Sequence, residues 1–148
     1  MNQSPKITKI TSEAAMLNFG KELAKKLQIT PVCLELIGDV GAGKTTMTRG
    51  LGAALGITSA ITSPSFTISK TYPFRAQDGT EKFLVHYDFY RLGDPGLMQD
   101  DLNESLADPN AITVVEWADS VNDALPADRL IVKIRYTADG GREIETSW

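Results

Sequence analysis

LELIGDVGAGKTTMTRGL, from Leu34 to Leu51, indicates the fold class of this chain. The apolar run VCLELIG (32–38) predicts a buried strand, and KTTMTRGLGAAL (44–55) predicts a helix with Met47, Leu51 and Leu55 on one side. A glycine-rich loop joins the two segments. Strand, loop and helix in this order are typical of an α/β protein with a parallel core.

The loop matches the P-loop pattern in full, with Gly38, four further residues, and then Gly43, Lys44 and Thr45. Its glycines let the backbone turn tightly and direct successive N–H groups inward, at the start of a helix whose dipole favours negative charge. Lys44 would supply a positive charge for the β- and γ-phosphates, and Thr45 a hydroxyl for Mg²⁺. The residues expected to bind the nucleotide here are Gly38, Asp39, Gly41, Ala42, Gly43, Lys44, Thr45 and Thr46.

The rest of the chain predicts a mixed sheet. Ser12 is the expected N-cap of a first helix, and the strand-like segments 65–74 and 82–91 should pair antiparallel across an Asp78-Gly79 turn. Further segments predict a short helix (96–107), a buried strand (111–117), a helical turn (118–125) and a terminal hairpin (130–137 with 142–148). We therefore expect one domain, 1–148, with a P-loop NTPase-like three-layer α/β/α fold, a parallel core and antiparallel hairpins.

Composition and charge exclude several classes of function. No apolar run is long enough to cross a bilayer, and the first residues contain no apolar signal-peptide core, so we expect a cytoplasmic protein without membrane contact. Residues 92–128 hold nine Asp and Glu and no Lys or Arg. Such a surface repels phosphate backbones, so direct DNA binding is not expected. It is either a solvated face or a docking surface for a basic partner.

Two acids end apolar strands, where a P-loop protein places its magnesium-side carboxylate. Asp88 ends FLVHYD and Glu116 ends AITVVE, and the sequence does not decide which one touches the ion. Strand alternation places His86 on the same face as Asp88, and we interpret this histidine as a structural hydrogen-bonding group. Cys33 is interpreted as a small buried hydrophobic residue.

The type of nucleotide is indicated by what the chain lacks. It has no Asn-Lys-x-Asp segment, the guanine-reading element of Ras-like GTPases, so ATP and ADP are the expected ligands, with Mg²⁺. The six arginines are dispersed, with no visible lid of the kind by which small-metabolite kinases clamp their acceptor.

Several motifs together resemble the bacterial TsaE family, also called YjeE. They are GDVGAGKTT (38–46), SPSF (63–66), HYDFYRL (86–92), VEWAD (115–119), LPADRL (125–130) and GRE (141–143). The resemblance spans nearly the whole chain. It implies a weak ATPase that works with the proteins TsaD and TsaB, which install threonylcarbamoyl on the adenosine beside the anticodon of certain tRNAs. Contact with tRNA would then be indirect, through the complex.

The resemblance also implies roles for particular residues. Lys44 and Thr45 would hold phosphate and Mg²⁺, Asp88 would be the Walker-B-like acid, and Glu116 a magnesium-side or catalytic carboxylate. Ser65 stands where the family usually has a threonine near the γ-phosphate, Ala118 where proline often follows Glu-Trp, and Met16 where a threonine is frequent. Trp117 would lie close to the nucleotide, and Arg142 and Glu13 would approach it more loosely.

Two other readings stay open. One is a small-metabolite kinase, which would phosphorylate a small acceptor without a protein partner. The other is a nucleotide-gated binding module that does not hydrolyse its nucleotide.

Overall fold

Seven strands form one mixed sheet in the computed structural model, which describes residues 6–27, 32–62, 64, 68–90 and 96–148. The elements in chain order are β1 (Lys6–Ile10), α1 (Glu13–Lys26), β2 (Val32–Ile37), α2 (Lys44–Leu55), β3 (Ser69–Arg75), β4 (Glu81–Asp88), α3 (Leu97–Ala107), β5 (Ala111–Glu116), the 3₁₀ segment η1 (Ala118–Ala124), β6 (Leu130–Tyr136) and β7 (Arg142–Thr146). The strand order is β1-β7-β6-β2-β5-β4-β3.

The sheet has a parallel centre and antiparallel flanks, as predicted. β6, β2, β5 and β4 run parallel, whereas β3 pairs antiparallel with β4 and β7 pairs antiparallel with β6. The P-loop follows β2, so it lies at the carboxyl edge of the parallel centre. In open α/β sheets this edge is where ligands bind.

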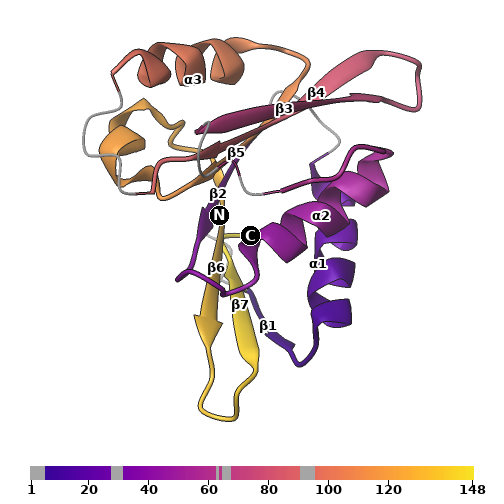
Figure 1. Ribbon diagram of the computed structural model, residues 1–148, viewed down its shortest axis with the longest axis vertical. Helices are drawn as coiled ribbons and strands as arrows, with labels where there is room; N and C mark the ends of the chain where they lie inside the picture. The colour runs from indigo at the N-terminus through magenta and orange to yellow at the C-terminus, as the bar shows by residue number, and fades with distance from the viewer. Residues whose placement is uncertain (1–5, 28–31, 63, 65–67, 91–95) are drawn as a thin grey trace.

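Helices cover both faces of the sheet, with α1 and α2 on one side and α3 on the other (Figure 1). The larger core lies under α1 and α2 and contains Leu34, Leu36 and Leu84; the smaller core lies under α3 and η1 and contains Tyr87 and Val115. Strand alternation produces this division, because successive side chains point to opposite faces. The predicted three-layer arrangement is confirmed.

Local signals explain where the two large helices begin and end. The Ser12 hydroxyl accepts a hydrogen bond of 3.0 Å from the Ala15 amide, as an N-cap should. α2 begins after Gly43 and ends before Gly56, and both of these capping glycines have positive φ. Glycine past the end of a helix satisfies the last carbonyls in a left-handed conformation that other residues adopt at a cost.

One strand, β1, was not predicted from the sequence. β1 pairs antiparallel with β7 over Lys6–Ile10 and forms one edge of the sheet. It is five residues long and mostly exposed, so it lacks the apolar run that marks a buried strand.

Cys33 in β2 is buried, as predicted, and burial is the main cause that raises the pKa of its thiol to about 12.

Candidate nucleotide-binding site

The P-loop adopts a backbone that only glycine tolerates well. Gly41 has a φ of +80° and Gly43 a φ of +117°, both in the left-handed region. A Cβ at Gly43 would lie 2.8 Å from Cε of Met16. Gly43 is the N-cap of α2 and has no side chain that could accept a hydrogen bond from the first amides of the helix. These amides also lack intrahelical acceptors. The loop therefore forms a cradle of N–H groups that suits anionic oxygens.

Lys44 is folded back onto this cradle. Its Nζ donates a 2.6 Å hydrogen bond to the Gly38 carbonyl and lies 3.5 Å from Oε1 of Glu116. The same ammonium sits 4.1 Å from the centre of the Trp117 ring. Lys44 is 6% exposed, so its charge is held among these three groups rather than in water.

The two candidate acids lie side by side on neighbouring parallel strands. Asp88 of β4 and Glu116 of β5 are register partners, and Glu116 is in turn paired with Leu36 of the P-loop strand. Glu116 thus lies one strand from the P-loop and Asp88 two. Glu116 is buried beside Lys44, whereas the half-buried Asp88 accepts a 2.9 Å hydrogen bond from the Tyr90 amide.

His86 lies behind Glu116. Its side chain is fully buried, and its Nε2 contacts Oε2 of Glu116. The predicted face is confirmed, because His86 contacts Glu116, and Glu116 is the register partner of Asp88 on the same face of the sheet. The predicted structural hydrogen bond is present, and its partner is the carboxylate nearest the P-loop lysine.

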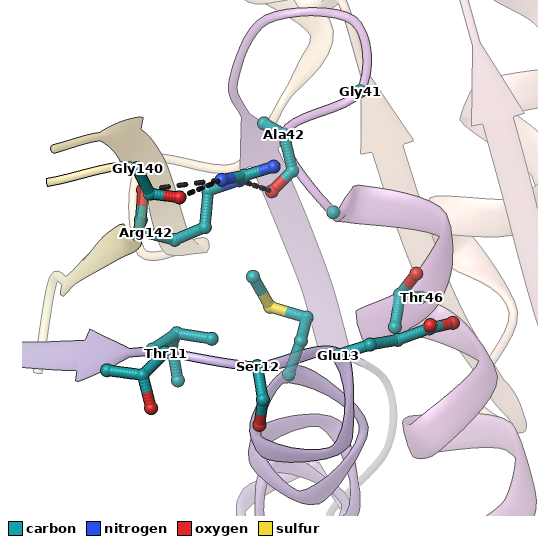
Figure 2. Close-up of a pocket in the computed structure, with 12 residues that line it drawn as sticks. Thr11, Ser12, Glu13, Gly41, Ala42, Thr46, Gly140 and Arg142 are labelled. Atoms are coloured by element: carbon teal, nitrogen blue, oxygen red, sulfur yellow. Dashed lines mark hydrogen bonds between the residues drawn. The ribbon is translucent and has the colours of Figure 1, made fainter.

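A pocket of about 230 Å³ opens on one side of the P-loop; we call it the Arg142 pocket. It is lined by Ile10, Thr11, Ser12, Glu13, Met16, Gly41, Ala42, Gly43, Thr46, Gly140, Gly141 and Arg142. Figure 2 shows Arg142 reaching toward the carbonyl of Ala42, to which its Nε donates at 3.1 Å, while Glu13 and Thr46 lie close together on the α1 and α2 side. The structure thus brings Glu13, Thr46 and Arg142 together beside the loop.

Trp117 and Asp39 line a different pocket, on the side of the loop that faces η1. Its walls include Glu35, Gly38, Asp39, Trp117 and Asp119. Trp117 has a φ of +54°, in the left-handed region, and its ring packs against Tyr90 with the ring centres 4.7 Å apart. Trp117 is therefore close to Lys44 but does not line the Arg142 pocket.

Tyr136 is a residue of the site that sequence reasoning missed. Its hydroxyl donates to the Val40 carbonyl at 3.3 Å, and its ring lies 4.2 Å from the Arg142 guanidinium carbon. No motif marks it, because it follows an ordinary strand pattern and reaches the P-loop only through the β6–β7 hairpin. Ser65, predicted to stand near the γ-phosphate, lies outside the described residues.

Within the described ranges, no three His, Cys, Asp or Glu side chains gather closely enough to hold a metal ion by themselves. None of the described helices is long and apolar enough to cross a membrane.

The chain has a three-layer α/β/α fold with a mixed sheet, and this fold is P-loop NTPase-like. Comparison with known families is more specific. The family model described as "Threonylcarbamoyl adenosine biosynthesis protein TsaE" matches residues 10–144. The chain belongs to the TsaE family, which is named for tRNA threonylcarbamoyladenosine biosynthesis.

Individual relatives agree over most of their length. The TsaE protein of Streptomyces coelicolor is 43% identical over 132 residues, which are 87% of this chain and 85% of that protein. The TsaE protein of Haemophilus influenzae is 34% identical over 140 residues, 92% of this chain and 85% of that protein. Among solved structures, Bacillus subtilis YdiB superposes with a TM-score of 0.73 at 30% identity, covering 97% of this chain and 84% of that one.

Proposed function

We propose that this chain binds ATP with Mg²⁺ at the P-loop and hydrolyses it. The observation that carries the proposal is the left-handed glycine cradle with a buried lysine and a buried glutamate at its mouth. Lys44 is held by a carbonyl, a carboxylate and an aromatic ring, and phosphate oxygens could replace these partners when ATP binds. Lys44 would then turn toward the β- and γ-phosphates.

The residues around the cradle fit Mg²⁺. This ion is commonly bound through one or two carboxylates together with substrate phosphates. Thr45 at the start of α2 and the paired Asp88 and Glu116 are the oxygen donors we assign to it. When bound, the ion neutralises charge that develops on the phosphates. Because Glu116 lies nearer the P-loop strand, we assign it the position closer to Mg²⁺ and place Asp88 further from the ion.

The remaining site residues have separate places in this proposal. Glu13, Thr46 and Arg142 would contact the nucleotide from the Arg142 pocket, beyond the α-phosphate. Trp117 would stay at the phosphate end, because its ring already contacts the lysine. Ser65 keeps its proposed part near the γ-phosphate. After hydrolysis the same cradle would hold ADP.

We further propose that ATP turnover serves tRNA modification through partner proteins. The relatives are named for tRNA threonylcarbamoyladenosine biosynthesis. The partners we propose are TsaD and TsaB in the cytoplasm, with tRNA reached through them. The acid-rich residues 92–128 favour a protein partner over direct contact with nucleic acid.

The test is steady-state ATP hydrolysis by the purified chain, alone and with a purified TsaB–TsaD pair, with and without Mg²⁺. We expect slow hydrolysis alone, a rise with the pair, and loss in both Lys44→Ala and Glu116→Gln. Phosphorylation of a small acceptor without partners would instead identify a kinase. Partner binding and tRNA modification that survive in Glu116→Gln without hydrolysis would identify a nucleotide-gated module.

A further inference from the structure

His86 is a buried polar side chain, and the proposed ATPase mechanism assigns it no contact with the nucleotide or with Mg²⁺. It is 0% exposed, and its Nε2 contacts Oε2 of Glu116. Its other ring nitrogen, Nδ1, is buried and has no hydrogen-bond partner among the described residues. Unpaired buried polar atoms are rare in native proteins, and each needs an explanation.

The Glu116 contact determines which nitrogen carries the hydrogen. An ionised carboxylate only accepts hydrogen bonds, so Nε2 must be the donor. In the neutral ring, where only one nitrogen carries a hydrogen, Nδ1 then has a lone pair rather than an N–H group. His86 therefore has one nitrogen, Nδ1, without a hydrogen-bond partner among the described residues, and its Nε2 contacts one carboxylate oxygen of Glu116.

We propose that His86 is a positioning residue for Glu116. By donating to Oε2 it fixes the rotation of the carboxylate, so that Oε1 faces Lys44, whose Nζ is 3.5 Å away, and the P-loop beyond. The inference rests on the proposed function, because that function gives Glu116 its task beside the phosphates and Mg²⁺. Partners that orient a ligating side chain typically change affinity or activity about 10- to 100-fold when they are removed.

The first test needs no catalysis. His86 is the only histidine in the chain, so the imidazole signals of ¹⁵N-histidine-labelled protein all belong to it. We expect Nε2 to be protonated and Nδ1 unprotonated. We also expect Glu116→Gln to shift the Nε2 proton, and Thr113→Val, which breaks the buried 2.7 Å hydrogen bond to Ser105, to leave it in place. A ring whose Nε2 carries no hydrogen, or signals unmoved by Glu116→Gln, would overturn the assignment.

The second test separates positioning from packing. His86→Leu removes the donor and keeps most of the volume, whereas His86→Gln keeps an N–H donor. We expect His86→Leu to lower kcat for ATP at least about 10-fold with little change in KM, and His86→Gln to recover part of the loss. Thr113→Val controls for a loss of stability alone. If kcat of His86→Leu equals that of the wild type, His86 does not position Glu116 for turnover.

The two tests also separate failure of this inference from failure of the proposed function. If the wild-type chain does not hydrolyse ATP under any condition, the proposed function fails, and the labelled-histidine spectra still decide whether His86 holds Glu116. If hydrolysis depends on Lys44 while the His86 variants match the wild type, the proposed function stands and the inference falls.

Discussion

The Lys44 side chain is buried and is held by three groups of the site. Its ammonium contacts the Gly38 carbonyl, the buried Glu116 carboxylate and the partly buried Trp117 ring. A cation over an indole is attracted by the ring's quadrupole, and the attraction strengthens when both groups are shielded from water. Any ligand that draws Lys44 away changes the environment of Trp117.

We therefore expect nucleotide binding to alter the fluorescence of Trp117. The chain has a second indole, Trp148, which packs against the larger core near Lys26. Adding ADP or ATP should change the emission of the wild type and of Trp148→Phe, but not that of Trp117→Phe. A full change that persists in Trp117→Phe would contradict the contact between lysine and ring as the source of the signal.

Helices α1 and α2 approach each other through glycines. A Cβ at Gly20 would lie 2.1 Å from the Met47 carbonyl oxygen, and a Cβ at Gly50 would lie 2.1 Å from the Leu17 carbonyl oxygen. Neither oxygen can move without its helix. This contact holds Glu13, at the start of α1, beside Thr46 at the start of α2, and so it shapes the Arg142 pocket.

Gly50→Ala should therefore lower the free energy of unfolding, by about 1–3 kcal/mol, because the overpacked backbone must shift. Gly52→Ala is the matched control in the same helix and with the same gain in helix propensity. Its added Cβ meets the mobile end of Ile61 instead. Urea unfolding measures both variants, and we expect the smaller loss for Gly52→Ala. A Gly50→Ala variant as stable as the wild type would contradict this account of the helix contact.

Helix α3 is tied to the sheet by Tyr87 of β4. The Tyr87 hydroxyl donates to the carboxylate of Asp101 and, at 3.1 Å, to its backbone carbonyl. Burial, followed by the hydrogen bond to Asp101, raises the pKa of Tyr87 above its ordinary value of 10.0. A pKa raised by folding gives stability that is complete below the unfolded value and is lost as pH rises toward the folded value.

The free energy of unfolding should consequently fall above pH 10 more steeply in the wild type than in Tyr87→Phe. Denaturant titrations from pH 8 to pH 11 measure this difference. We expect Tyr87→Phe to be less stable at pH 8 because it lacks the hydrogen bonds to Asp101, so the comparison concerns the slope with pH and not the absolute value. Parallel profiles for the two proteins would show that Tyr87 does not carry the effect.

At the scale of the whole molecule, sequence reasoning succeeded where the signal is local. The bounds of α2 are marked by Gly43 and Gly56, and the division into two cores follows from strand alternation. It failed for β1, whose five residues become a strand by pairing with β7 at the other end of the chain.

The site shows the same contrast between local and distant signals. The P-loop can be recognised in the sequence because its residues are contiguous. The contact of Arg142 with Ala42 joins residues 100 positions apart, and no local pattern predicts it; the family resemblance suggested Arg142. Alternation placed His86 on the correct face but could not name Glu116 as its partner.

The acid-rich residues 92–128 give a prediction about assembly. Asp100 and Glu104 are exposed on α3, and Glu104 lines a groove over the exposed edge of the smaller core. If this face meets a basic partner, Asp100→Asn with Glu104→Gln should weaken binding to the TsaB–TsaD pair and reduce its salt dependence. Glu22→Gln with Glu81→Gln removes the same charge elsewhere and serves as the control. Equal affinity for both double variants would exclude α3 as the docking surface.

Whether the P-loop drives tRNA modification can be tested by measuring threonylcarbamoyladenosine in tRNA by nucleoside mass spectrometry. The tRNA would come from bacteria depleted of their own TsaE protein and supplied with this chain. We predict that the wild type and Thr113→Val restore the modified nucleoside, and that Lys44→Ala, expressed to the same level, does not. Full restoration by Lys44→Ala would contradict the claim that the P-loop drives tRNA modification.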